Sequence, residues 1–443
     1  MEQPPETPEE TPDVYKKMGW DLEKELSQFP IEDLKLHVIE RDGKKTYPKE
    51  LANCCQLLRN HPDFKNKIRF DSFKNFGEYQ MDGTWEKISD NIVSVLQDKI
   101  QGMYNAFSSY GKDIVNQAIE LVAYENTQDT VTDWANTLTW DGENRLESFF
   151  PNAYNVENTL YHQLVGKNFW LGMAARILHP GCHHRFVLII EGSQNVGKSK
   201  SLRAIAGDDW FLEDAPLPSE SVSFHMALWG KVLVEFSEGA IFRKVDMEKI
   251  KSLVSTPIDT IVKKWGRHPI DIKRRCVFAI TTNQTSYFSD RTGNTRFFPI
   301  TTEKIDLEYI RKNREQLFAE AIGRVKDGEK WWDETLEAKR IFESEQSSRM
   351  AVSSLEEKIE EWLNKPSNLT RTIDGFLMKD LMLSVLEGKE NQADINLAGS
   401  ILRENGFVRD KYKRTLEGIR GRFWKKDYKN SVEIEGFEFD GKA

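Results

Sequence analysis

Hydrophobic residues form short, nearly unbroken runs at three places in the chain, 186–190, 231–236 and 276–282. Runs of this length, rich in β-branched residues and ended by polar ones, are typical of strands buried on both faces of a parallel sheet. The stretches between them are long enough to hold crossover helices. The pattern therefore predicts an α/β fold built around a parallel sheet.

Apolar residues recur at helical spacing in several other segments. The segment 68–85 predicts one or two strands, and 131–146 predicts a helix that ends in a turn at Asp141-Gly142. A long apolar helix is expected over 160–178, where Pro180-Gly181 stops it. The remaining helices are expected within 85–124, 305–342, 353–363, 377–386 and 397–405.

Near the C-terminus the predicted order is helix, helix and then a hairpin over 407–424 around Gly418, which is the order of a winged-helix module. Residues 403–429 hold ten basic and four acidic side chains, so this is the most cationic part of the chain. Nucleic acid and protein are equally plausible partners for such a fold.

These elements suggest a division of the chain into domains. We expect a disordered tail at 1–12, a segment of uncertain structure at 13–66, a mainly helical N-terminal domain at 67–165, the sheet-containing core at 166–345, a winged-helix-like domain at 353–429 and an acidic tail at 430–443.

The first buried strand runs into a sequence that fits G-x-x-x-x-G-K-[ST], the phosphate-binding loop. Its glycines allow backbone N–H groups to point at phosphate oxygens, and the helix that follows adds its positive N-terminal end. In this role Lys198 reaches the β- and γ-phosphates, and the Ser199 hydroxyl ligates Mg²⁺. The expected nucleotide-binding residues are Gly192, Ser193, Gln194, Asn195, Val196, Gly197, Lys198, Ser199 and Lys200.

The second strand ends in acids, and the third ends in an amide. Glu235 and Glu238 are candidates for ordering Mg²⁺ and polarising the attacking water, although Glu238 is as readily explained as a solvated strand end. The carboxyl ends of parallel strands lie near the ligand in open α/β sheets, so Asn283 is expected to contact the γ-phosphate or orient the water. An ordinary Asn turn is the alternative.

A basic hairpin is predicted between the second and third strands. The segment 261–268 alternates around Gly266 and carries Lys263, Lys264, Trp265, Arg267 and His268 at its tip. Basic residues interleaved with an aromatic can follow a phosphate backbone and stack on a base. From composition alone, a solvated charged turn is the preferred interpretation.

A glycine-containing loop over 289–300 supplies Arg291 and Arg296, which are candidates for an arginine finger. Acting on a neighbour's nucleotide would require a ring of subunits, and a structural ion pair is the alternative.

The overall composition narrows the class of protein. The net charge of −9 argues against a uniformly basic surface, so any polyanion site must be local. No apolar run approaches a membrane span, and no secretory leader opens the chain. We therefore expect a cytoplasmic protein with reduced cysteines and no membrane partner. A metal site at Cys182-His183-His184 is not expected, because adjacent side chains do not easily converge on one ion.

Taken together, six elements in the expected order make the chain resemble the virulence-associated E family of phages and mobile elements, which is related to superfamily 3 helicases. The resemblance covers roughly 68–424. The elements are Thr139-Trp-Asp-Gly-Glu-Asn-Arg145, Pro180-Gly-Cys182, the phosphate loop, Glu235-Phe-Ser-Glu238, Thr281-Thr-Asn283 and Gly293-Asn-Thr-Arg-Phe-Phe-Pro299.

The resemblance implies an AAA+-like ATPase core that uses ATP and Mg²⁺. It also implies a hexameric ring in a bacterial host cell. In such a ring the hairpin would bind single-stranded or forked DNA in the central channel. The resemblance therefore favours DNA binding by the hairpin over a solvated charged turn. The family often has two adjacent arginines in its last motif. Here Thr295 precedes Arg296, so the finger is either Arg291 or Arg296. Any priming would come from a separate primase or polymerase.

Two functions are consistent with these features. The first is an ATP-dependent DNA translocase or helicase that serves replication of a phage or mobile element. The alternative is a nucleotide-dependent DNA-binding scaffold that hydrolyses slowly and does not unwind DNA. The role of the basic hairpin distinguishes them, since only a motor requires it for DNA-stimulated hydrolysis.

Overall fold

The computed structural model describes residues 27–216, 218, 221–237, 244–262, 268–288, 294–350, 354–387, 391–416 and 418–427. Contacts divide the chain into two compact units. Unit 1 consists of Met1–Gln284 and Thr295–Gln346, and unit 2 consists of Thr285–Asn294 and Ser347–Ala443.

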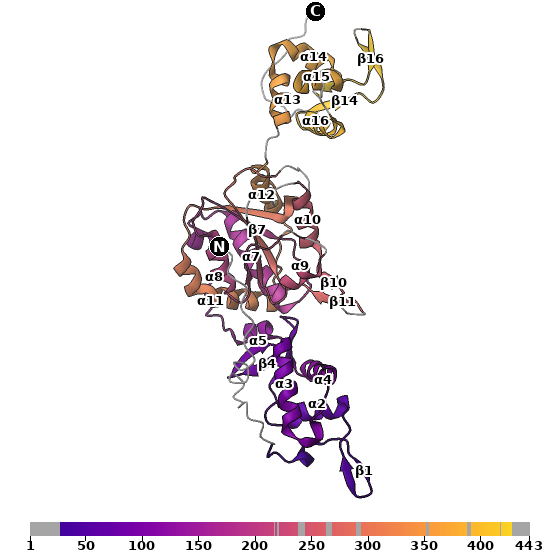
Figure 1. Cartoon of the computed structure of the whole chain (residues 1–443). Coiled ribbons are helices and arrows are strands. Elements are labelled where there is room, and N and C mark those ends of the chain that lie inside the picture. The colour runs from indigo at the N-terminus through magenta and orange to yellow at the C-terminus, as the bar shows by residue number, and fades with distance from the viewer. Residues whose placement is uncertain are drawn as a thin grey trace, which may run out of the picture. The chain divides into compact units, whose positions relative to one another are not determined.

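A five-stranded sheet forms the centre of unit 1 (Figure 1). All of its neighbouring strands are parallel, which confirms the predicted α/β class. The strand order is β13-β7-β12-β9-β8, so β12 lies between β7 and β9. The strands are β7 (Val187–Glu191), β8 (Phe211–Leu212), β9 (Leu233–Ser237), β12 (Val277–Thr282) and β13 (Phe297–Thr301).

Strand β13 corrects the expectation of a loop extending to residue 300. Its side chains are buried up to Ile300, and it pairs with β7 along its whole length. Pro299 lies within this strand and has no N–H to donate, which is tolerated because β13 is at the edge of the sheet. The carbonyl of Pro299 instead accepts a hydrogen bond from the Tyr161 hydroxyl at 2.8 Å.

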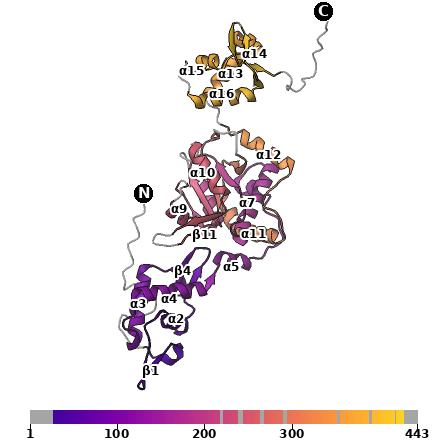
Figure 2. The same ribbon diagram turned by 90° about the vertical axis from the view of Figure 1, so that its right-hand side faces the viewer.

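Helices cover both faces of the sheet. Figures 1 and 2 show α9 (Val222–Ala227) and α10 (Lys244–Ser255) on one side, with α7 (Leu160–Leu178) and α11 (Leu307–Lys326) on the other. Helix α7 has the predicted bounds and is buried over most of its circumference, as its largely apolar sequence favours. Helix α11 packs on α7 and on α8 (Lys198–Ala206), while α12 (Leu336–Ser347) completes the unit.

The segment 131–146 forms a shorter helix than predicted. Helix α5 (Thr130–Thr137) stops before Leu138, whose backbone is extended. The Asp141 carboxylate accepts a hydrogen bond from the Glu143 N–H at 3.0 Å, and such local side-chain bonds compete with helix formation. A loop therefore connects α5 to α6 (Phe149–Tyr154).

The N-terminal part of unit 1 has its own hydrophobic core, to which both the segment 34–64 and the segment 68–123 contribute buried residues. Its sheet has the order β5-β4-β3-β6. Its strands are β3 (Ile68–Asp71), β4 (Phe76–Met81), β5 (Thr84–Lys87) and β6 (Thr127–Gln128). The helices of this part are η1 (Ile31–Leu34), α2 (Leu51–Asn60), α3 (Asp90–Met103), η2 (Asn105–Phe107) and α4 (Lys112–Glu125). Strands β1 (Ile39–Arg41) and β2 (Lys44–Thr46) form a separate, exposed hairpin.

Unit 2 contains a helical body followed by short antiparallel strands. Strand β14 pairs with β17, β15 pairs with β16, and Phe376 forms an isolated bridge with Trp424. The elements are α13 (Ser354–Asn364), η4 (Pro366–Asn368), α14 (Leu369–Asp374), α15 (Met378–Leu386), α16 (Gln392–Glu404), β14 (Phe407–Arg409), β15 (Arg414–Leu416), β16 (Ile419–Gly421) and β17 (Trp424–Lys426).

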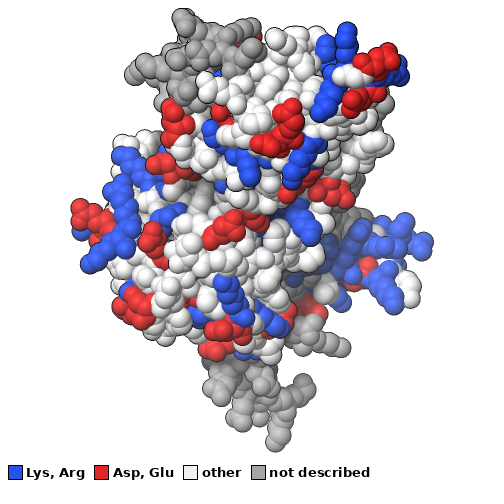
Figure 3. All heavy atoms as spheres, turned by 90° about the horizontal axis from the view of Figure 1, so that it is seen from below, with Lys and Arg blue, Asp and Glu red and all other residues white. Residues whose placement is uncertain are grey.

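In the part of the chain that the structure describes, no helix has the length and apolar character needed to cross a membrane. Acidic and basic side chains are interspersed over the face shown in Figure 3, as expected for a chain without a uniformly basic surface.

Candidate active site

The phosphate-binding loop lies between β7 and α8, in the strand–loop–helix arrangement that the motif requires. A Cβ at Gly192 would lie 2.4 Å from the carbonyl oxygen of Thr302, so only glycine fits at the start of the loop. Gly197 has a φ of 101° at the end of the loop, where a side chain would be strained. Residues 193–195 are exposed, and Lys200 is exposed on the first turn of α8.

The Lys198 ammonium donates hydrogen bonds to the carbonyl oxygens of Gly192 and Ser193, at 2.7 and 2.9 Å. The lysine therefore extends back across its own loop from the N-terminal end of α8. A cation and a helix N-terminus on the same loop provide two of the features that bind phosphate groups.

Glu235 is fully buried in the middle of β9, and its side chain connects two strands, β9 and β12, to the loop. Its Oε1 atom accepts hydrogen bonds from the Ser199 hydroxyl at 2.7 Å and from the Thr281 hydroxyl at 2.6 Å. Its Oε2 atom is buried and has no hydrogen-bond partner. A buried acceptor without a partner is costly, so this oxygen suits an additional ligand.

Burial raises the pKa of the Glu235 carboxyl, and the hydrogen bonds from Thr281 and Ser199 offset part of that rise. The acidic side chains of Glu213 and Asp214 raise the pKa further, because a second negative charge nearby disfavours ionisation. These two residues follow β8, and our sequence analysis did not select them. A cation bound among Ser199 and these carboxylates would favour their charged forms.

The residues present fit a Mg²⁺ ion, which prefers oxygen ligands and retains several water molecules. Ser199 and Glu235 would hold the ion, directly or through its water molecules. When bound, it would neutralise charge on the nucleotide phosphates.

Asn283 directly follows β12 and is exposed. The register pairs Thr282 with Glu191, and the Thr282 carbonyl accepts a hydrogen bond from the Gly192 N–H at 3.1 Å. Asn283 is therefore one residue beyond the point where β12 meets the start of the phosphate loop. Glu238, the other acid predicted for the site, lies outside the described residues.

Arg296 lies far from the loop of its own chain. It ends the short helix η3 (Asn294–Arg296) before β13, and its Nε atom donates to the Ser255 hydroxyl at 3.2 Å. The next residue, Phe297, pairs with Val187, at the opposite end of β7 from the loop. Five strand residues at ~3.3 Å each separate the two ends by roughly 16 Å. Arg291 lies outside the described residues.

The hairpin between β9 and β12 is present at its stem, where β10 (Ile258–Ile261) pairs with β11 (Ile270–Lys273). A buried ion pair between Asp259 and Arg274 fixes its base, and Arg274 also donates to the carbonyl of Leu253 at the end of α10. His268 is exposed beside β11. The other predicted DNA-contacting residues, Lys263, Lys264, Trp265 and Arg267, lie outside the described residues.

A side chain that our sequence analysis missed holds the far end of α8. Arg314 on α11 donates to the carbonyl oxygens of Ile205 at 2.9 Å and Ala206 at 2.6 Å. A cation at a helix C-terminus satisfies unpaired carbonyl groups and complements the helix dipole. Helix α8 is therefore positioned at one end by the loop and at the other by α11.

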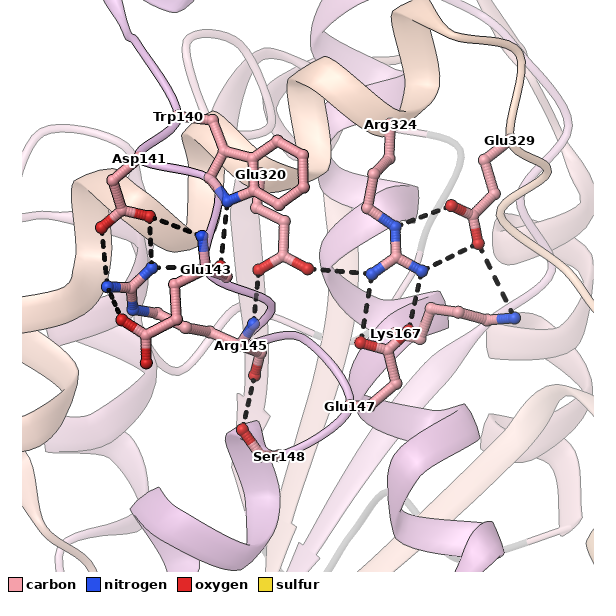
Figure 4. Close-up of polar contacts among 10 residues, drawn as sticks. All are labelled: Trp140, Asp141, Glu143, Arg145, Glu147, Ser148, Lys167, Glu320, Arg324 and Glu329. Atoms are coloured by element: carbon pink, nitrogen blue, oxygen red, sulfur yellow. Dashed lines mark hydrogen bonds and ion pairs between the residues drawn. The ribbon is translucent and has the colours of Figure 1, made fainter.

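The Trp140–Arg145 turn is also anchored on α11 (Figure 4). The backbone N–H of Arg145 donates to the buried Glu320 carboxylate at 2.7 Å, and the Arg145 guanidinium pairs with Asp141. Arg324, one turn beyond Glu320, makes ion pairs with Glu147, Glu320 and Glu329. These contacts indicate a structural role for the turn, since they connect it to α11, the helix that supports α8.

Comparison with known proteins is consistent with this geometry. Residues 135–351 match the model of the virulence-associated protein E-like domain. The chain contains a virulence-associated protein E-like domain. The matched range includes the phosphate loop, Glu235 and the anchored turn, so all of the candidate site lies within this domain.

The chain is also similar to solved structures of the NrS-1 C-terminal region. An apo structure of its A form has a TM-score of 0.46 and 14% identity, covering 81% of this chain and 96% of that chain. A second apo structure has a TM-score of 0.45 and 13% identity, covering 80% and 95%. No curated protein matches the chain.

Proposed function

We propose that this protein is an ATP-dependent DNA translocase or helicase that acts in replication of a phage or mobile element. The observation that carries the proposal is the buried Glu235 carboxylate, which is bonded to Ser199 of the phosphate loop and has one oxygen unpaired. A carboxylate next to the Mg²⁺-binding hydroxyl is what nucleoside triphosphate hydrolysis needs to order the metal and its water. The five-stranded parallel sheet supports the AAA+-like core that the family resemblance implies.

In this proposal each residue has a separate task. Lys198 binds the β- and γ-phosphates, Ser199 and Glu235 hold Mg²⁺, and Asn283 contacts the γ-phosphate or orients the attacking water. An arginine completes the site by stabilising charge on the transferred phosphoryl group. Since Arg296 lies at the opposite end of the sheet from its own loop, it would serve the nucleotide of a neighbouring subunit, which supports a ring with hydrolysis at subunit interfaces.

The first test is ATP hydrolysis with and without single-stranded DNA. We expect DNA to stimulate the wild-type enzyme and Lys198→Ala to abolish turnover. The variant Lys263→Ala/Lys264→Ala is expected to hydrolyse ATP but lose the stimulation by DNA. Lys44→Ala/Lys45→Ala is the matched control, because it removes two adjacent lysines from the exposed β1–β2 hairpin. Hydrolysis that is independent of DNA would favour the scaffold function instead.

A mixing experiment tests the ring. Lys198→Ala and Arg296→Ala are each expected to be inactive, because each removes one side of an interface site. Mixed subunits would form some interfaces with both residues intact, so partial recovery of hydrolysis is expected. If Arg296→Ala alone hydrolyses ATP as the wild type does, Arg296 is not the finger. If both variants are inactive and their mixture remains inactive, Arg296 does not act across an interface.

A further inference from the structure

Residues 403–426 of unit 2 carry a cluster of exposed cations. The proposed ATPase function gives these cations no role. Between residues 403 and 426 the exposed side chains include eight cations, namely Arg403, Arg409, Lys411, Lys413, Arg420, Arg422, Lys425 and Lys426. Arg414 is the exception, because it is half-buried and bonded to Asp410 and to the carbonyl of Asp374. The exposed cations therefore surround a hairpin whose base is held by a separate ion pair.

The charge of unit 2 is distributed unevenly. Helix α13 packs its apolar side chains into the core of the unit, and its exposed positions include Glu357, Glu360 and Glu361. Apart from Arg403 at the end of α16, the cations lie on the strands and turns that follow this helix. This uneven distribution favours a polyanion at residues 403–426 over one at α13.

Helix α16 brings a different chemistry to this region. Gln392, Asn396, Ser400 and Arg403 are exposed, and their spacing places them on one stripe of the helix. The Gln392 amide donates to the Asn396 side-chain oxygen at 3.1 Å. Except for Arg403, the stripe is uncharged and rich in donors and acceptors, the groups that read base edges in the major groove. The eight helical rises from Gln392 to Ser400, at ~1.5 Å each, span about 12 Å, or roughly three to four base pairs.

One contact connects the stripe to the hairpin. The Arg403 guanidinium lies over the ring of Trp424, 5.8 Å from its centroid, and Trp424 begins β17, the strand that leaves the hairpin. Strand β14, which pairs with β17, follows α16 after one short turn. Figure 1 shows β16 projecting from the helical body of unit 2. The C-terminal end of the stripe therefore lies beside β17, the strand that follows the β15–β16 hairpin.

We propose that this surface binds double-stranded DNA, with α16 in the major groove and the β15–β16 hairpin against the adjacent backbone. Lys411, Lys413, Arg420 and Arg422 contact phosphates, whereas Gln392 and Asn396 read bases. This site is separate from the proposed ATPase and from the single-strand contacts of the β10–β11 hairpin. It would allow the protein to select a duplex sequence before acting on it.

Charge complementarity favours DNA over a protein partner. Eight exposed cations in a short segment, next to amides at major-groove spacing, fit a partner that offers both regular phosphates and base edges. An acidic protein would use the cations but would not require the amides. The two partners therefore predict different results for the amide variants.

Binding to the full-length chain tests the electrostatic part. The probe is a fluorescein-labelled duplex pool of random sequence, followed by anisotropy at increasing salt. We expect Lys411→Ala/Lys413→Ala to weaken binding by about tenfold or more and to lower the salt dependence by about two phosphate contacts. Lys358→Ala/Lys365→Ala is the matched control and should bind as the wild type does, because Lys358 lies on the acidic helix α13 and Lys365 directly follows it. Equal binding by both variants, or no duplex binding, would overturn the proposal.

Selection from the same pool tests the reading of sequence. The wild type is expected to enrich a motif of a few base pairs, while Asn396→Ala binds the random pool within about twofold but loses the enrichment at one or more positions. Capture of an acidic protein without any enriched motif would contradict the proposal. If Lys411→Ala/Lys413→Ala still shows ATP hydrolysis that single-stranded DNA stimulates, the duplex-binding site is separate from the motor. Failure of either proposal therefore leaves the other testable.

Discussion

Replacing Glu235 by Gln should change stability and activity in opposite directions. The side chain is fully buried, one of its oxygens has no partner, and burial raises the pKa of its carboxyl. Gln keeps the shape and the Oε1 acceptor that Ser199 and Thr281 use, but it removes the buried charge. Removing a costly buried ion is expected to stabilise the ligand-free protein by about 1–3 kcal/mol at pH 8.

The stability difference between Glu235→Gln and the wild type should depend on pH. Because the pKa of Glu235 is raised above its ordinary value of 4.5, the folded chain retains the proton to a higher pH than the unfolded chain does. The free energy of unfolding of the wild type therefore falls as pH rises above 4.5 through the folded-state pKa. The Gln variant lacks this decrease, so its advantage should be small at pH 4.5 and largest above the folded-state pKa of Glu235.

The assay is thermal or urea unfolding at pH 4.5 and pH 8, without nucleotide or Mg²⁺, together with ATP hydrolysis. We expect hydrolysis by Glu235→Gln to fall by about 10²–10⁴-fold, the range for loss of a catalytic carboxylate. Thr281→Val is the control, since it removes a donor to the same carboxylate and should destabilise the protein by about 1–3 kcal/mol. A Gln variant that is less stable than wild type at pH 8, or that hydrolyses normally, would refute the reasoning.

Three further predictions concern the surroundings of the site. Gly192→Ala places a Cβ 2.4 Å from a backbone carbonyl, so nucleotide binding measured by titration should be lost, whereas Gly111→Ala has nothing within 4 Å and should bind normally. Arg324→Met leaves the buried Glu320 without its ion-pair partner, so urea unfolding should show a loss of about 3–5 kcal/mol, and an unchanged midpoint would exclude this role. Burial lowers the pKa of His184 to about 3, so His184→Gln should flatten the loss of stability as pH falls from 6.5 toward 3, a slope of at most about 1.4 kcal/mol per pH unit. Parallel wild-type and variant curves would show that another group causes that loss.

Much of the core around the phosphate loop could be predicted from the sequence. The strand before the phosphate loop, the helix at 160–178 and the stem of the basic hairpin all occur where the pattern placed them. These elements are encoded locally, because runs of buried residues and the positions of glycine and proline determine backbone conformation over a few residues. The residue types of the loop likewise specify phosphate chemistry through four positions close together in the chain.

The tertiary structure decided which distant residues meet. Thr281 bonds to Glu235 only because β12 lies between β7 and β9, and Arg314 reaches the end of α8 only because α11 packs across it. Strand β13 was missed because its proline is unfavourable in a strand, except at an edge that the sequence does not reveal. The sequence alone thus determined the elements and the chemistry of the loop, through interactions between near neighbours. Strand order and the partners of Glu235 depend on packing between residues far apart in the chain, which no local pattern records.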